Sequence, residues 1–244
     1  MKAFGITDSG KVRKENQDCF RFDIPESGDI CTAVLCDGMG GAQAGSVASR
    51  MAADAFMFHA ANSLDAASSA QDMKNILVEA VNYANIKVYD RSFADFACMG
   101  MGSTLVAFVA TEKRCFVANV GDSRAYLIAG NKISQISRDH SLVEELVEQG
   151  KITPEEAQTH PQKNIITRAI GVEASVHADI FKMKPQSGDI LLLCSDGLSN
   201  LVSDAEMLEK VKNAAEAEDA CRALLDTALE RGAPDNVTVL IAEL

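Results

Sequence analysis

The sequence predicts an α+β fold in which two antiparallel β-sheets pack face to face and helices cover both outer faces. Short apolar runs with alternating or β-branched residues occur in consecutive groups joined by hairpin-length turns, which favours antiparallel pairing. Long helical patterns come in pairs between the groups of strands, as in layered α+β folds. Because so many strands are expected to form more than one sheet, we predict a four-layer αββα sandwich.

Ten segments have the alternation or the β-branched content that is typical of strands. They span residues 2–7, 19–23, 30–36, 103–110, 114–120, 124–129, 132–136, 176–183, 189–194 and 236–243. Residues 111–113 and 129–131 have the length and the composition of hairpin turns. We therefore expect the strands on either side of each turn to pair with each other.

Longer segments with the pattern of helices span residues 43–61, 71–90, 204–212 and 216–231. In residues 71–90, apolar side chains such as Ile76, Leu77 and Ala80 recur on one face, which favours packing against a sheet. Gly232 and Pro234 mark the end of the last helix.

Residues 138–172 differ from the rest of the chain because they interrupt the strands with short, charged helical patterns. One helix is predicted at 142–149, and Thr153 followed by Pro154 indicates the start of a second. We expect a small helical insertion that forms a flap beside the functional site. The whole chain, 1–244, is expected to form a single domain around it.

The composition excludes several classes of protein. A net charge of −12 argues against binding nucleic acid, which requires clustered Lys and Arg. The sequence contains no apolar stretch of about 18 residues and no signal-peptide core at its start, so neither membrane insertion nor secretion is expected. Seven cysteines without a Cys-x-x-Cys spacing indicate buried free thiols and a reducing compartment. We expect a cytoplasmic protein, and a monomer by default.

Five carboxylates stand out because most of them lie next to Gly, Ser or Asn at the end of a predicted strand. They are Asp18, Asp37, Asp122, Asp196 and Asp235. Each alone could be an ordinary turn residue, and Asp122 could form a hairpin turn with a surface pair to Arg124. An acidic residue follows a buried strand more than once along the chain, and this recurrence favours a role for these residues as metal ligands. Carboxylates that converge would repel one another unless cations lay between them, and oxygen-only ligands select Mg²⁺ or Mn²⁺.

Other hydrolase chemistries lack their motifs in this sequence. No Cys is followed by Arg six residues later, no Asp-x-Asp is present, and no Gly-x-Ser-x-Gly elbow occurs. The four histidines include no His-x-x-x-His pair, which disfavours a zinc centre built on histidine. Arg13 lies five residues before Asp18, and a guanidinium binds phosphate oxygens in pairs. Carboxylate-bound hard metals remain.

The chain resembles the metal-dependent type 2C (PPM) serine/threonine protein phosphatases in their short bacterial form. The motifs that carry the resemblance occur in order over nearly the whole chain. They are Thr7-Asp8-Ser9-Gly10, Arg13, Asn16-Gln17-Asp18, Asp37-Gly38-Met39-Gly40-Gly41, Met101-Gly102-Ser103-Thr104, Gly121-Asp122-Ser123-Arg124, Asp139-His140-Ser141, His160-Pro161, Asn164 to Gly171, Cys194 to Leu198 and Asp235 to Val239. The resemblance implies an αββα sandwich with the flap near its active site.

The resemblance also implies a binuclear Mn²⁺ or Mg²⁺ centre and a role for each carboxylate. Asp37 would bridge both ions, and the carbonyl of Gly38 would bind one of them. Asp196 and Asp235 would hold the first ion, Asp18 would support the second, and Asp122 with Asp196 would form a weaker third site. Arg13 would bind the substrate phosphate. A metal-activated water would hydrolyse phosphoserine or phosphothreonine on substrates of a protein kinase, with no covalent intermediate. Arg13, Asp37 and Asp196 are therefore the expected catalytic residues.

One position departs from the family pattern. Ala42 stands where many bacterial relatives have a histidine that protonates the leaving oxygen. Either a metal-bound water or another group would have to replace it, and the flap position of His140 disfavours that residue as the candidate. A general acid typically contributes about 10²–10⁴-fold. We expect Ala42→His to raise the hydrolysis rate of alkyl phosphates such as phosphoserine more than that of aryl phosphates, whose leaving groups need no acid. Equal effects on both substrates would refute this hypothesis.

Two alternative functions stay open at this level. A phosphatase-like regulatory or binding module with weak catalysis is consistent with the change at Ala42, although the five carboxylates argue against it. The second alternative is a phosphatase that is specialised for one partner in a regulatory switch. In that case the flap would determine which partner binds. Metal-dependent hydrolysis of a phosphopeptide would separate an enzyme from a binding module.

Overall fold

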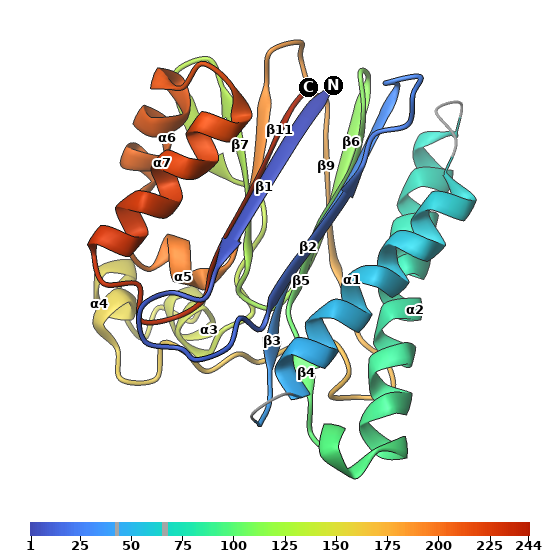
Figure 1. Cartoon of the computed structure of the whole chain (residues 1–244), viewed down its shortest axis with the longest axis vertical. Coiled ribbons are helices and arrows are strands. Elements are labelled where there is room, and N and C mark those ends of the chain that lie inside the picture. Colours follow the sequence, from blue (N-terminus) through green and yellow to red (C-terminus); the bar gives the residue numbers. More distant parts are fainter. Residues whose placement is uncertain (42–43, 65–67) are drawn as a thin grey trace.

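The computed structural model describes residues 1–41, 44–64 and 68–244, and it shows two antiparallel sheets packed face to face (Figure 1). The first sheet has the strand order β1-β11-β10-β7-β8, and the second has the order β2-β3-β5-β6-β9 with β4 paired to β3. One pair of helices covers the outside of each sheet (Figure 1). The predicted four-layer αββα sandwich is confirmed.

The strands and helices follow the expected order along the chain. The strands are β1 (Lys2–Asp8), β2 (Asp18–Asp23), β3 (Ile30–Met39), β4 (Gly102–Ser103), β5 (Leu105–Thr111), β6 (Arg114–Val120), β7 (Arg124–Ala129), β8 (Lys132–Gln135), β9 (Asp179–Met183), β10 (Ile190–Cys194) and β11 (Val237–Glu243). The helices are α1 (Ala44–Ser63), α2 (Ala70–Ala94), η1 (Phe96–Cys98), α3 (Leu142–Glu148), α4 (Pro154–Thr159), α5 (Asp196–Ser199), α6 (Asp204–Asn213) and α7 (Ala217–Glu230).

The core consists of three apolar layers between the four layers of structure. Successive residues of β3 alternate between two of them: Val34 and Cys36 pack against α1 and α2, whereas Ala33 and Leu35 face the other sheet. The third layer lies between the first sheet and helices α6 and α7. Because β3 is buried on both faces, its sequence is a continuous apolar run with few polar residues.

Several expectations from the sequence hold in the structure. The turns at residues 111–113 and 129–131 join paired neighbours, β5 with β6 and β7 with β8. The insertion between β8 and β9 contains α3 and α4, and Thr153 caps the start of α4 as its sequence predicts. All seven cysteines are buried and free. No helix in the described ranges is long and apolar enough to cross a membrane.

Three local predictions need correction. Asp37 does not follow its strand but lies within β3, because Gly38 and Met39 pair with Ser103 and Gly102 of β4. Asp196 is not a simple turn residue, since it begins the short helix α5. Residues 121–123 do not form a hairpin, because β6 and β7 belong to different sheets and this segment crosses between them.

Candidate metal centre

The five predicted carboxylates gather at one end of the sandwich, where β3 ends and α5 and the flap lie (Figure 1). The pKa of Asp37 is raised well above its usual range, first by burial and then by the charges of Asp18, Asp196, Asp122 and Asp235. Asp37 thus senses all four of the other carboxylates, although they come from segments far apart in sequence. Such a concentration of like charge favours a cation in its midst.

Asp18 is the most buried member of the group, with 8% of its surface exposed. It lies directly opposite Asp37 in the β2–β3 pairing. Its Oδ2 accepts hydrogen bonds from Ser195 Oγ at 2.8 Å and Thr238 Oγ1 at 2.6 Å. Its Oδ1 is buried and has no hydrogen-bond partner. Burial raises the pKa of Asp18 to about 6 despite these two hydroxyl donors.

The unpartnered oxygen of Asp18 indicates that the site fits a metal ion. A buried acceptor without a partner is costly, and a cation would satisfy it. The surrounding donors are carboxylate and carbonyl oxygens, which Mn²⁺ and Mg²⁺ prefer. No three His, Cys, Asp or Glu side chains in the described part of the chain are arranged to hold an ion as they stand.

The two hydroxyls that hold Asp18 are expected to matter for metal affinity. Ser195→Ala or Thr238→Val removes one of the two hydrogen bonds to Oδ2 and holds the Asp18 carboxylate less firmly in place. Partners that orient metal ligands typically contribute about 10–100-fold to affinity. We expect each variant to weaken Mn²⁺ binding about tenfold in isothermal titration calorimetry. Ser199→Ala, one turn away on α5, serves as the control, and equal losses in all three variants would contradict this role.

Asp196 and Asp235 are held together by a close backbone contact. Gly197 packs so tightly on the carbonyl of Asn236 that a Cβ there would overlap this oxygen. Asn236 also fixes the loop that precedes Asp18: its Oδ1 accepts from the Gln17 N–H at 2.8 Å, and its Nδ2 donates to the carbonyls of Ser9 and Glu15 at 3.0 and 2.9 Å. Burial, followed by the charge of Asp235, raises the pKa of Asp196.

A second group of hydroxyls connects Asp37 to Asp122. The backbone N–H of Asp37 donates to Thr104 Oγ1 at 2.9 Å, and this hydroxyl shares a 2.7 Å hydrogen bond with Ser123 Oγ. The carbonyl of Asp37 accepts from Ser103 Oγ at 2.9 Å and from the Thr104 N–H at 2.8 Å. Burial and the nearby charges of Asp196 and Asp139 raise the pKa of Asp122 to about 7.

Arg13 lies at the mouth of the site and is paired with a carboxylate. Its Nη2 donates to Asp235 Oδ2 at 2.7 Å, and 56% of its side chain is exposed. Hydrogen bonding to Asp235 and the charges of Asp37 and Asp196 raise the pKa of Arg13. The structure thus brings Arg13 to the carboxylates, as predicted, but with Asp235 rather than a phosphate as its partner.

The flap is anchored beside the site by two polar contacts. Asp139 accepts a forked ion pair from Arg124, with distances of 2.7 to 3.1 Å. His140 Nδ1 accepts from the Gly121 N–H at 3.0 Å. Nε2 lies 3.3 Å from Asp179 Oδ2 and 3.0 Å from Arg168 Nη1.

These contacts argue against His140 as the general acid. Both of its ring nitrogens have partners, and only 5% of its surface is exposed. Burial, followed by the charge of Arg168, lowers its pKa. His140 instead holds the turn that carries Asp122. Ala42, where the family pattern has a histidine, and the adjacent Gln43 lie outside the described residues.

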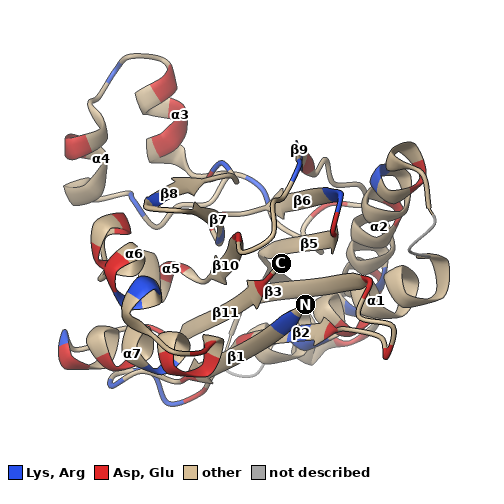
Figure 2. Ribbon diagram, turned by 90° about the horizontal axis from the view of Figure 1, so that it is seen from above, with Lys and Arg blue, Asp and Glu red and all other residues tan. Residues whose placement is uncertain are grey.

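A cavity of about 440 Å³ lies between the flap and helices α5 and α6. Asp122 and Asp196 line its inner end, and Glu144 of α3 and Glu206 of α6 line its walls. Acidic residues are accordingly visible on α3 and α6 in Figure 2. The cavity gives the carboxylates a path to solvent on the side of the flap.

The residues that orient the carboxylates were not assigned a role from the sequence. Ser195, Thr238, Thr104 and Asn236 all lie within the quoted motifs, next to a site residue or opposite one. A signal for them exists, because a small polar residue beside a strand-end Asp can reach its backbone or its carboxylate. Only the strand pairing shows which Asp each of them serves.

Comparison with known proteins agrees with this geometry. Residues 11–233 match the family model described as "Protein phosphatase 2C". The serine/threonine phosphatase stp of Listeria innocua is 39% identical over 244 residues, covering 100% of this chain and 96% of the relative. The crystal structure of Stp1 from Staphylococcus aureus superposes with a TM-score of 0.91 at 37% identity, covering 100% of this chain and 94% of that one.

A further solved structure bears directly on the metal. The catalytic domain of the phosphatase PstP, in complex with two manganese ions, superposes with a TM-score of 0.86 at 33% identity, and the match covers 99% of this chain and 97% of that one. The match of the family model over most of the sequence, together with relatives that align over their whole length, decides the assignment. The chain belongs to the protein phosphatase 2C family, whose members are metal-dependent serine/threonine phosphatases.

Proposed function

We propose that the five carboxylates form a centre for two divalent cations, Mn²⁺ or Mg²⁺, at which the protein hydrolyses phosphoserine and phosphothreonine. The observation that carries this proposal is the buried, unpartnered Oδ1 of Asp18 facing the group around Asp37. Asp37 would bridge the two ions with the carbonyl of Gly38 as a further ligand. Asp196 and Asp235 would hold one ion, and Asp18 would support the other. Asp122 with Asp196 would offer a weaker third site.

When bound, the cations supply an activated water and neutralise the oxygens of the phosphoryl group. The chain itself contributes position and charge. Ser195 and Thr238 hold Asp18, and Thr104 holds the backbone of Asp37. Arg13 would leave Asp235 and donate two parallel hydrogen bonds to the phosphate, which suits its planar guanidinium. In the described part of the chain no cysteine is placed as a nucleophile, since all seven are buried.

We further propose that the substrates are phosphoproteins made by a serine/threonine kinase and that the protein acts as a cytoplasmic monomer. Seven free thiols favour a reducing compartment. The cavity beside the flap is open to solvent and reaches Asp122 and Asp196, so a phosphorylated side chain on a protein surface has room to approach.

Metal-dependent hydrolysis tests this function most directly. Phosphoserine, phosphothreonine and phosphotyrosine peptides are incubated with the protein after chelation and again after addition of Mn²⁺ or Mg²⁺. We expect release of phosphate from the first two peptides only when metal is present. A folded protein that binds Mn²⁺ but releases no phosphate from any peptide would instead be a binding module.

A further inference from the structure

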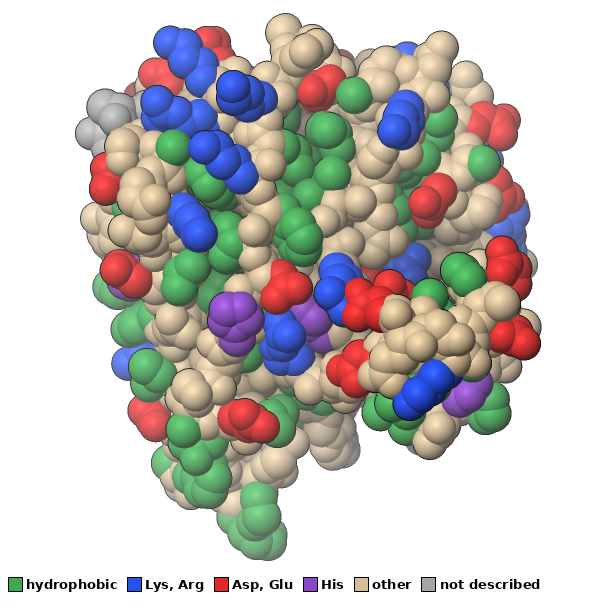
Figure 3. All heavy atoms as spheres, turned by 180° about the vertical axis from the view of Figure 1, so that it is seen from behind, with side chains coloured by type: hydrophobic (Ala, Val, Ile, Leu, Met, Phe, Trp, Pro, Cys, Tyr) green, Lys and Arg blue, Asp and Glu red, His purple; other side chains and the backbone are tan. Residues whose placement is uncertain are grey.

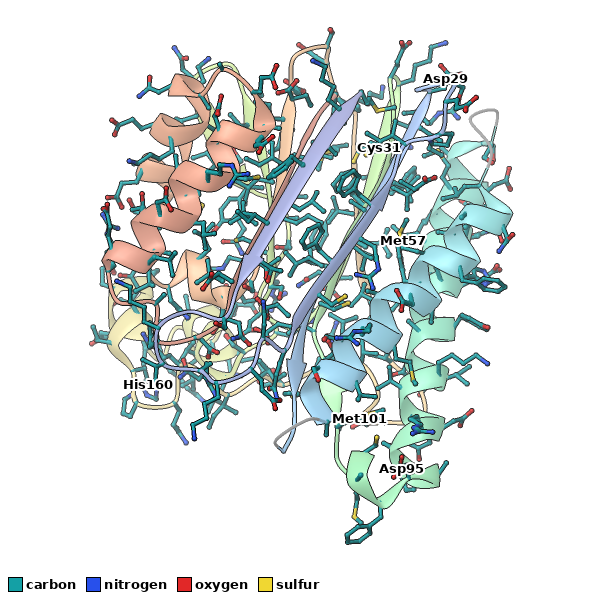
Figure 4. The ribbon with its side chains drawn as sticks, in the orientation of Figure 1. Asp29, Cys31, Met57, Asp95, Met101 and His160 are labelled. Carbon is teal, nitrogen blue, oxygen red and sulfur yellow. The ribbon has the colours of Figure 1, made fainter. Side chains whose placement is uncertain are left out.

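A cluster of exposed apolar side chains lies at the end of α2, near the candidate metal centre. We call it the apolar tip; it comprises Phe93, Phe96, Met99 and Val172, which are 75%, 87%, 60% and 56% exposed. The four residues line a hollow of about 500 Å³ together with Met101. Figure 3 shows hydrophobic side chains gathered at this end of the molecule, and Figure 4 labels Asp95 and Met101 there.

The tip is a built structure rather than a frayed helix end. Arg91 Nη2 donates to Asp95 Oδ2 at 2.6 Å, and Asp95 Oδ1 accepts from the Ala97 N–H at 3.0 Å. These bonds end α2 and start η1, so that the side chains of Phe93 and Phe96 stay directed to solvent. Exposed apolar residues scattered singly are normal, but a contiguous patch of this kind marks an interaction site.

The tip is continuous with the metal centre through a short length of backbone. Asp37 is two residues before Met39, Met39 pairs with Gly102, and Gly102 is three residues after Met99. This path cannot exceed about 25 Å between Asp37 and Met99. Val172 borders both the tip hollow and a second hollow of about 560 Å³ that Met39 lines. An extended peptide covers that span with about seven residues.

We propose that the apolar tip binds apolar side chains of the phosphoprotein substrate, no more than about seven residues along its chain from the phosphorylated Ser or Thr. This inference rests on the proposed function, because the phosphate at the metal centre fixes one end of the bound segment. A segment held there has to cross the neighbouring surface, and on the side of Met39 the exposed apolar residues of the tip lie within its reach. The occupant is therefore an extended substrate segment with bulky apolar residues.

Two other occupants fit the surface less well. A membrane that attracts proteins by charge requires clustered Lys and Arg, whereas Arg91 at the tip is paired with Asp95 and the chain has a net charge of −12. A stable dimer usually buries about 800 Å² on each partner, which is more than these four side chains offer. A substrate segment needs only a few apolar contacts in addition to the phosphate.

Hydrolysis of matched peptides by surface variants tests the proposal. The substrates are phosphothreonine peptides with a Leu-Phe pair at different positions within about seven residues of the phosphate, on either side, and the same peptides with Ser-Gly in place of the pair. We expect one of the Leu-Phe peptides to have a KM about tenfold lower than its Ser-Gly counterpart. The double variant Phe96→Ser with Met99→Ser is expected to abolish this difference and to leave kcat for p-nitrophenyl phosphate unchanged.

Phe58→Ser provides the matched control, because Phe58 is 63% exposed on α1 and is absent from both hollows. It is expected to preserve the preference for the Leu-Phe peptide. The proposal is overturned if the double variant keeps that preference. It is also overturned if the variant changes only the sedimentation coefficient, which would indicate a dimer interface, or loses only vesicle binding, which would indicate a membrane surface. Absence of hydrolysis of every peptide and of p-nitrophenyl phosphate by the wild type would instead refute the proposed function.

Discussion

Replacement of Asp37 by Asn is expected to lower kcat for a phosphothreonine peptide by about 10³-fold or more and, at the same time, to stabilise the metal-free protein. Asp37 senses the charges of the four other carboxylates, and burial raises its pKa further. Asn removes the charge and keeps the shape, so the repulsion in the empty site falls. The two effects have opposite signs because the same charge that destabilises the metal-free fold is needed to bind the ions.

Thermal unfolding and steady-state kinetics measure the two effects. In the presence of a chelator we expect Asp37→Asn to raise Tm by about 3 °C, which corresponds to about 1 kcal/mol for a chain of this length. Added Mn²⁺ should raise the Tm of the wild type much more than that of the variant. Asp90→Asn on the exposed face of α2 is the control. A variant that is both inactive and less stable without metal would show that Asp37 is simply required for folding.

The stability of the metal-free protein is expected to fall as pH rises from about 4 to about 7. The pKa values of Asp18 and Asp122 are raised to about 6 and about 7, against 3.8 for an unperturbed Asp. In this window the folded state holds more protons than the unfolded state, so each increase in pH favours unfolding. We expect a total loss of about 3 kcal/mol, since the two groups influence each other and partly exposed charges are screened.

Urea unfolding at several pH values, with chelator or with Mn²⁺, measures this dependence. Cations compete with protons for carboxylates, so Mn²⁺ should stabilise the protein most at high pH and reverse the slope. His140 acts in the opposite direction, because its pKa is lower in the folded protein than in the unfolded chain. The unfolded chain therefore binds a proton at this residue more readily, and the contribution of His140 to stability falls as pH decreases. Asp122→Asn isolates the contribution of one carboxylate. An unchanged slope in that variant would show that Asp122 is ionised throughout.

The layered fold could be predicted from the sequence because each element carries its own local pattern. The alternation in residues 114–120 and 124–129 gave strands with the observed bounds, and Thr153 with Pro154 located the start of α4. What local pattern cannot show is which sheet each strand joins and which strands distant in sequence are neighbours. Residues 121–123 have the composition of a hairpin turn, yet they cross between the sheets because β7 pairs with β10 and β8 instead.

The same limit applies to the site. Most of the five carboxylates could be identified as candidates because an Asp beside Gly, Ser or Asn near a strand end is a recognisable local feature. The hydrogen bonds that orient them join residues up to 220 positions apart, as from Thr238 to Asp18, and depend on tertiary packing. His140 shows the converse error: its residue type suits acid catalysis, but its burial against Gly121 and Asp179 gives it a structural task.

The ion pair between Arg13 and Asp235 has a thermodynamic consequence for how the enzyme is loaded. In the proposed function Arg13 would bind a phosphate and Asp235 a cation, so the ion pair would have to open before either ligand binds. The first ligand to bind would then meet the cost of opening the pair, and the second would not. Under that proposal, cation and phosphate would raise each other's affinity by the same factor, and retention of the phosphate product would rise together with metal occupancy.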